Sequence, residues 1–115
     1  FSVTAPRMRV NDVRMAAIGM LPGAELYHLF ALAPTLPVGS GPLFGLPFDA
    51  FVLQQITQPL GAQPFHVSVS ATGTYAFVTG PGILAPGYVV DEITIEVIPG
   101  SATLGYVSPV TRVVF

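Results

Sequence analysis

The clearest strand in the sequence is YVVDEITIEVIPG, residues 88–100. Apolar and polar residues alternate along it with the period of two that a β-strand imposes. One face is apolar and carries Ile93, Ile95 and Val97. The opposite face is polar and carries Glu92, Thr94 and Glu96. We therefore expect the first face to be core and the second to be at least partly exposed to water.

The rest of the chain also favours strands, because twelve Pro and twelve Gly leave little room for helices of ordinary length. Residues 64–80 predict a β-hairpin around the tight turn Thr72–Thr74. Residues 13–20 and 25–32 flank the turn LPGA and are predicted to be paired strands, although their Met, Ala and Leu also favour short helices. Residues 48–57 fit either a strand or one short helix.

Two proline-containing segments complete the prediction. Residues 33–47 are expected to form an ordered loop or short edge strands that bury their apolar side chains, namely Leu36, Val38, Leu43, Phe44 and Leu46. Residues 102–115 read as a strand interrupted at Pro109. The whole chain, 1–115, is thus predicted to be one all-β domain, an antiparallel β-sandwich or jelly roll of about eight or nine strands.

Charge is scarce in this chain. Charged residues make up 9% of the sequence, against about 25% in ordinary soluble domains. A folded monomer of this size exposes roughly 6,000 Å², so its surface would be apolar and poorly charged. We expect that surface to be hidden against copies of the chain or neighbouring surface proteins. A net charge of −2 excludes binding to a run of nucleic-acid phosphates, and the lack of a long apolar stretch excludes a transmembrane helix.

The few charges are distributed unevenly, with basic residues near the beginning and five carboxylates between Glu25 and Glu96. Residues 1–10 alternate as a strand does up to Pro6, which predicts an arm that adds a strand to a neighbouring copy. The alternative is an ordinary first strand folded back on its own sheet. The candidate assembly contacts are Phe1, Val3, Ala5, Arg7, Arg9 and Arg14.

No catalytic, cofactor-binding or metal-binding residue is predicted. His28 and His66 are the only side chains suited to acid–base chemistry near neutrality, and no nucleophile motif accompanies them. Asp91 and Glu92 are adjacent and would point to opposite faces of a strand, which argues against a shared calcium ion. Ring stacking on a glycan is an alternative use of the tyrosines, Tyr27, Tyr75, Tyr88 and Tyr106.

The run of residues 41–100, closing in LGYVSPVTRVVF, resembles β-rich C-terminal domains of large secreted proteins from planctomycetes and similar bacteria. The shared features are a glycine-rich opening through Gly45, the step Pro59-Leu60-Gly61, a Gly-x-Tyr-x-Phe segment at 73–77 and the ending at Phe115. The resemblance implies an exported β-sandwich. It implies no activity and no site residue.

These observations predict a non-enzymatic structural subunit or adhesion-type domain of an extracellular or cell-surface assembly, such as a fibre, sheath or surface layer. A carbohydrate- or surface-binding module of a larger secreted protein is the first alternative. A small outer-membrane β-barrel is the second, and the twelve Pro count against it.

Overall fold

The computed structural model describes residues 2–9, 12–32, 34–78, 87–101 and 103–114. Antiparallel strands dominate this part of the chain, which confirms the all-β class. The elements in chain order are β1 (Ser2–Arg9), β2 (Asp12–Ile18), β3 (Glu25–Leu32), α1 (Ala50–Ile56), β4 (His66–Ser68), β5 (Tyr75–Val78), β6 (Val89–Val97), β7 (Leu104–Val107) and β8 (Thr111–Val114).

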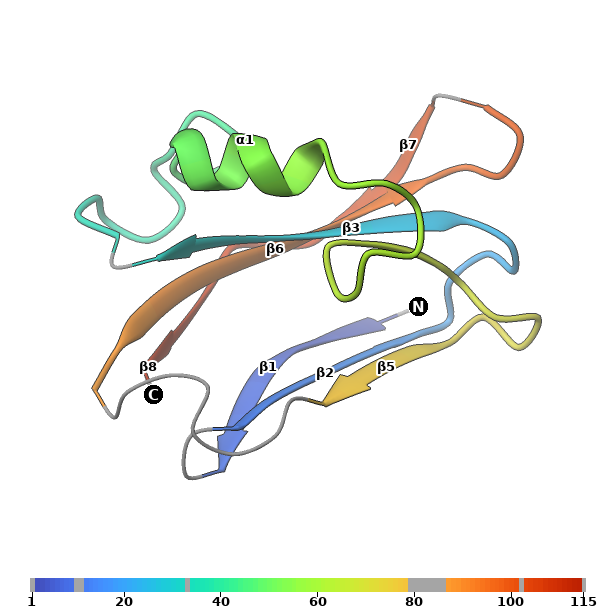
Figure 1. The fold of residues 1–115 in the computed structure, drawn as a ribbon, viewed down its shortest axis with the longest axis horizontal. Helices are drawn as coiled ribbons and strands as arrows, with labels where there is room; N and C mark the ends of the chain where they lie inside the picture. The colour runs from blue at the N-terminus through green and yellow to red at the C-terminus, as the bar shows by residue number, and fades with distance from the viewer. Residues whose placement is uncertain (1, 10–11, 33, 79–86, 102, 115) are drawn as a thin grey trace.

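The strands form two sheets. The three-stranded sheet has the order β1-β2-β5, and the five-stranded sheet has the order β4-β3-β6-β7, with β8 also paired to β6. Figure 1 shows the five-stranded sheet in the middle of the molecule, with the three-stranded sheet on one side of it and α1 on the other. Both faces of the five-stranded sheet are therefore covered.

Helix α1 forms within residues 48–57, where the sequence left strand and helix open. Its N-cap is Asp49, whose Oδ1 accepts a hydrogen bond of 2.8 Å from the backbone N–H of Val52. Val52 and Gln55 lie three positions apart, as residues on one helix face do, and both are buried. Pro59 follows shortly after the end of the helix, where it cannot continue the helical hydrogen bonding.

The predicted strand pairs form differently from the expectation. Residues 13–20 and 25–32 contribute strands β2 and β3, but these belong to different sheets and do not pair with each other. The expected hairpin within 64–80 is wrong in the same way, since β4 pairs with β3 and β5 pairs with β2. Two antiparallel stretches of chain thus run side by side and pass together from one sheet to the other.

A corner of the fold lies where both stretches change sheets. There the N–H of Met20 bonds to the carbonyl of Gly73 at 3.0 Å, and the N–H of Val69 bonds to the carbonyl of Ala24 at 2.8 Å. Gly73 has φ +75°, and a Cβ added to it would lie 2.5 Å from the carbonyl oxygen of Met20. The close approach of the two stretches at this corner therefore requires glycine at position 73.

Strand β6 is buried on both faces. Ile93 is fully buried and Ile95 is 7% exposed, as predicted, whereas Val97 at the end of the strand is only partly buried. The prediction that Glu92 and Glu96 reach water is wrong, because each is only 1% exposed, and Thr94 is fully buried. The polar face is covered by the three-stranded sheet, a tertiary contact that alternation within a single strand cannot reveal.

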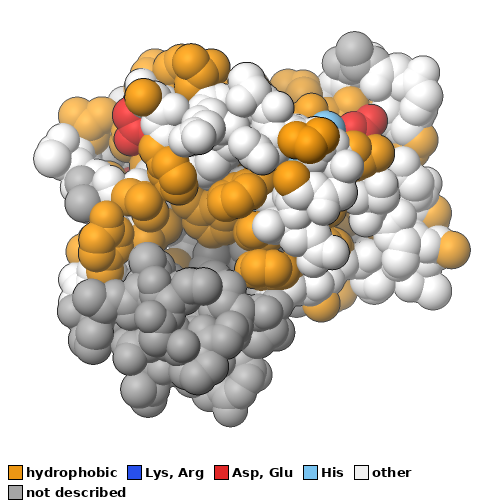
Figure 2. Space-filling model, viewed as in Figure 1, with side chains coloured by type: hydrophobic (Ala, Val, Ile, Leu, Met, Phe, Trp, Pro, Cys, Tyr) orange, Lys and Arg blue, Asp and Glu red, His pale blue; other side chains and the backbone are white. Residues whose placement is uncertain are grey.

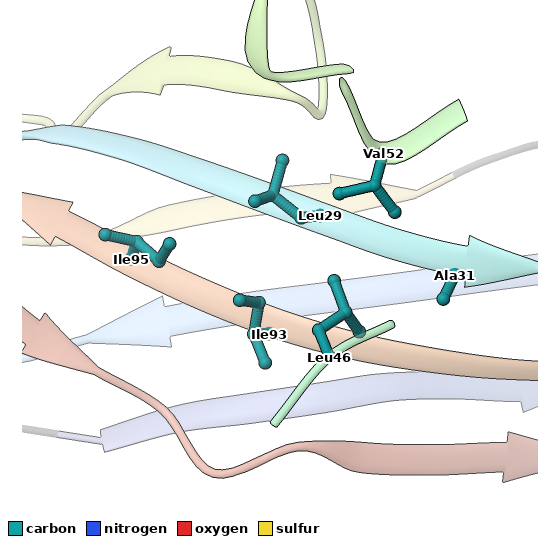
Figure 3. Packing of buried hydrophobic residues seen from close by; sticks show 6 residues of the cluster. All are labelled: Leu29, Ala31, Leu46, Val52, Ile93 and Ile95. Atoms are coloured by element: carbon teal, nitrogen blue, oxygen red, sulfur yellow. The ribbon is translucent and has the colours of Figure 1, made fainter. Parts of the chain in front are cut away.

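The larger core cluster lies between the five-stranded sheet and α1. Figure 3 shows Leu29 and Ala31 from β3, Ile93 and Ile95 from β6, Val52 from α1 and Leu46 from the preceding loop. Of the five apolar residues expected to be buried within residues 33–47, Leu46 is fully buried and Leu43 is partly buried. The expected burial of the other three apolar residues is wrong, since the exposed fractions are 42%, 50% and 53% for Leu36, Val38 and Phe44.

We predict that Gly73→Ala lowers the free energy of unfolding more than Gly23→Ala does. Both glycines have positive φ, +75° and +79°, so each alanine variant carries the backbone strain of about 1–2 kcal/mol. Only at Gly73 does the added Cβ also meet backbone atoms, whereas nothing lies within 4 Å at Gly23. Urea denaturation of the two variants measures the difference. Equal losses would show that the corner is not tightly packed.

Candidate functional site

A buried polar cluster lies on the face of the five-stranded sheet that the three-stranded sheet covers. The hydroxyl of Thr94 donates to Glu92 Oε1 at 2.7 Å, and Thr94 Oγ1 lies 3.1 Å from His28 Nδ1. Because the hydroxyl proton is used on Glu92, Oγ1 accepts from His28, which places a proton on Nδ1. His28 Nδ1 is also 3.7 Å from Glu92 Oε1. The cluster therefore joins β3 and β6 through side chains as well as backbone.

This cluster contains a hydroxyl, an imidazole and a carboxylate, but it is closed to solvent. His28 and Glu92 are each 1% exposed and Thr94 is fully buried. The ring of Tyr75 from β5 stacks on His28 with centroids 5.3 Å apart. Among the described residues, neither His28 Nε2 nor the Tyr75 hydroxyl has a hydrogen-bond partner. The cluster is therefore buried at the contact between the two sheets, where Tyr75 of one packs on His28 of the other.

Glu96 uses its carboxylate to bind backbone on two other elements. Its Oε2 accepts from the N–H of Leu21 at 3.1 Å, next to the corner of the fold. Its Oε1 accepts from the N–H of Tyr106 in β7 at 3.3 Å. A buried carboxylate needs such donors, because leaving water without them is costly.

A second histidine cluster lies nearer the surface. His66 Nε2 is 2.6 Å from Glu25 Oε1, and His66 Nδ1 is 3.0 Å from the carbonyl oxygen of Gln58. Both ring nitrogens thus face acceptors. Tyr27 stacks on the imidazole with centroids 4.1 Å apart. Burial, and then the charge of Glu25, raise the pKa of Tyr27. His66 itself is buried, at 8% exposed.

Arg112 on β8 fastens a loop to the five-stranded sheet. It donates from Nε to Asp91 Oδ1 at 2.7 Å and from one terminal nitrogen to Asp91 Oδ2 at 3.0 Å. The same nitrogen donates to the carbonyl oxygen of Leu36 at 2.7 Å. Hydrogen bonding to Asp91 raises the pKa of Arg112.

These contacts remove most of the acidic residues from the surface. Of the five carboxylates between Glu25 and Glu96, those of Asp91, Glu92 and Glu96 are buried. Only Glu25 and Asp49 remain to offer negative charge to a neighbour. Most of the negative charge that the sequence places between Glu25 and Glu96 is therefore inside the fold.

The predicted assembly contacts occupy the first two strands. Val3, Arg7 and Arg9 lie in β1 and Arg14 lies in β2, with Arg7 directly opposite Arg14. Ala5 falls within the shift of register between Thr4 and Arg7, where Pro6 also lies. Phe1 lies outside the described residues. β1 pairs with β2 of its own chain, as in the alternative of a folded-back first strand.

The most prominent exposed feature is apolar and surrounds α1. Its residues lie in the preceding loop, in the helix and in the turn after it. They are Phe44 at 53% exposed, Phe48 at 49%, Phe51 at 37%, Leu53 at 49% and Leu60 at 53%. We call these five residues the α1 surface. Figure 2 shows apolar side chains spread over this side of the molecule, with acidic side chains only in isolated places.

Phe44 stands at the tip of a tightly bonded turn before α1. Gly41 and Gly45 exchange backbone hydrogen bonds of 2.8 and 3.0 Å, and Leu43 and Leu46 exchange bonds of 3.0 and 2.9 Å. Phe44 has φ 52°, a left-handed conformation that a bulky residue rarely adopts. The turn therefore holds an exposed aromatic ring in a strained backbone position.

A shallow hollow of about 210 Å³ lies beside α1, lined by Phe51, Gln54, Gln55, Gln58 and Phe65. The side-chain amide of Gln55 accepts from the N–H of Phe30 and donates to its carbonyl, both at 2.8 Å. Phe65 packs edge-on against Phe30, with centroids 6.2 Å apart. These contacts with β3 fix the floor and one wall of the hollow. The sequence feature that could have indicated this hollow is the pair Gln54-Gln55, which is polar within an otherwise apolar segment.

We predict that Glu96→Ala lowers the free energy of unfolding by about 1–3 kcal/mol for each backbone N–H that loses its acceptor. Those groups are on Leu21 and Tyr106. Glu25→Ala is the matched control, because the Glu25 side chain is 42% exposed and only one group, Nε2 of His66, loses its partner, so the loss should be smaller. Denaturant titration at neutral pH compares the two. A smaller loss for Glu96→Ala than for Glu25→Ala would contradict the assigned contacts.

We predict that the free energy of unfolding falls in alkali and that Tyr75→Phe removes part of this fall. Burial raises the pKa of Tyr75 above the ordinary value of 10.0. The unfolded chain loses this proton first, so stability is unaffected below the unfolded pKa and declines as the pH rises through the folded pKa. Because the hydroxyl has no described partner, Tyr75→Phe should not reduce stability at neutral pH. Thermal melts across the alkaline range test this.

Three further observations bear on identity. Within the described residues, no group of three or more His, Asp or Glu side chains is placed to hold a metal ion. No helix in that part of the chain is long and apolar enough to cross a membrane. Comparison with protein-family models, with curated proteins and with solved structures finds no match for this chain.

Proposed function

We propose that this chain is a non-enzymatic structural subunit or adhesion-type domain of an extracellular assembly, and that copies of it bury apolar surface against one another. The observation that carries the proposal is the contrast between exposed apolar and exposed charged side chains. In the part of the chain whose side chains are described, eleven large apolar residues are between 37% and 62% exposed. Of the five carboxylates between Glu25 and Glu96, only those of Glu25 and Asp49 reach the surface. A monomer exposing such a surface would associate.

The domain itself is proposed to be a single β-sandwich over residues 1–115. Support comes from the two antiparallel sheets and from the packing of Tyr75 in one sheet on His28 in the other. The buried polar face of β6 gives the same support, since only a covering layer keeps Glu92 and Glu96 from water. Export to the cell surface is part of the proposal and rests on the resemblance to domains of secreted proteins.

A glycan-binding module based on the tyrosines has less support. Tyr75 and Tyr106 pack against one core cluster, and Tyr27 packs against the other. Rings that contribute to the core do not form an open stacking surface. The candidate arm at residues 1–10 has less support as a charged contact, because three of the five carboxylates that it was expected to meet are buried.

We predict that the purified chain forms species much larger than 12.0 kDa at micromolar concentration. Light scattering after gel filtration, without detergent, measures the mass. An apolar contact should persist at high salt, whereas contacts between arginines and carboxylates should weaken. A clean monomer of 12.0 kDa would refute the proposed self-association.

A further inference from the structure

We propose that Phe44 of one copy inserts into the hollow between Phe51 and Phe65 of the next copy, joining the copies head to tail. This inference rests on the proposed self-assembly and names the contact that produces it. It uses two features that the fold leaves unexplained, the strained exposed ring of Phe44 and the hollow beside α1.

The first argument concerns the position of Phe44. At φ 52° a glycine or asparagine would be accommodated with less strain than a phenylalanine. More than half of the residue's surface, 53%, nevertheless stays exposed within one copy. Its neighbours Leu43 and Leu46 anchor the turn in the core. A strained residue on a rigid support is a mark of function, and the part of Phe44 that can act is its exposed ring.

The second argument concerns the hollow. Its lining combines two aromatic rings with three glutamines and contains no charged side chain, so an apolar group entering it displaces no ion. At about 210 Å³ it is smaller than sites for drug-sized ligands. It has room for one aromatic side chain, which Phe51 and Phe65 can meet in the edge-on or offset contacts that aromatic pairs prefer. Because Gln55 and Phe65 are held by Phe30, the hollow is formed before the partner arrives.

The third argument concerns symmetry. The turn that carries Phe44 contributes no residue to the lining of the hollow. Phe44 and the recess are therefore built from different residues, and the proposal places the Phe44 of one copy against the recess of the next. A head-to-tail contact of this kind is heterologous, and it repeats into a ring or an open filament. A stable interface needs about 800 Å² from each partner, and the rest of the α1 surface supplies further apolar area around Phe44.

The decisive variant is Phe44→Asn, which removes the ring and suits the left-handed backbone. We expect it to fold with an unchanged or higher denaturation midpoint and to appear as a 12.0 kDa monomer in light scattering. Leu104→Asn is the matched control, because Leu104 is 45% exposed and belongs neither to the α1 surface nor to the lining of the hollow. We expect this control to assemble as the unmodified chain does.

A mixing experiment tests the head-to-tail geometry. Gln54→Arg places a charge in the hollow and leaves Phe44 intact, so it should also be monomeric alone. A mixture of Phe44→Asn and Gln54→Arg chains should form dimers of about twice 12.0 kDa and nothing larger. One variant supplies the recess and the other the ring, and no further copy can be added. A contact between two Phe44 rings would give no such dimer.

Several outcomes would overturn the inference. Normal assembly of Phe44→Asn, or a mixture that remains monomeric, rejects the contact while leaving self-assembly in place. If Phe44→Asn assembles normally and Gln54→Arg instead loses retention on insoluble cellulose or chitin, the hollow is a sugar site and the inference is wrong. A monomeric unmodified chain rejects the contact together with the proposed function.

Discussion

Carboxylates can lie inside a protein only where hydrogen-bond donors replace water. β6 carries three buried carboxylates, and two of them, Glu92 and Glu96, lie on its polar face. Glu92 is met by the hydroxyl of Thr94, and Glu96 by backbone N–H groups of Leu21 and Tyr106. The second carboxylate thereby holds the corner of the fold and β7 against the central strand. With the polar face satisfied in this way, the other face of β6 is free to build the apolar core with α1. The two sheets, the corner and the helix all depend on this one strand.

Much of the fold could be predicted from local pattern, and the failures have a common cause. Strand periodicity found β6, and the turn residues between the segments were identified correctly. The predicted strand pairing was wrong because the sequence of a turn such as 70–74 does not show whether the flanking strands pair with each other or enter two different sheets. Alternation marked Glu92 and Glu96 as exposed, since polar residues on a strand usually are. Only a covering sheet, formed by residues distant in sequence, makes that face internal.

For the candidate site too, composition predicted the general character of the surface but not its position. Low charge in the sequence predicts a surface that needs a partner, and the exposed side chains around α1 agree with that expectation. The sequence did not predict where this surface lies, because Phe44 stands between Leu43 and Leu46 and was expected to be buried with them. Its exposure follows from the turn geometry, in which the flanking leucines point inward and the tip cannot. Side-chain hydrophobicity alone does not distinguish a residue that anchors a loop from one that the loop displays.

The side-chain amide of Gln55 has a consequence for the kind of material this domain can form. By bonding both the N–H and the carbonyl of Phe30, it occupies the edge of β3 beyond the end of β4, as a peptide group of another strand would. On the opposite side of the sheet, Pro109 separates β7 from β8, both of which pair with β6. A stretch of edge occupied in this way is not open to pairing with a strand of another copy. In the assembly proposed above, contacts beside α1 would therefore be made by side chains between intact units, which could separate without unfolding.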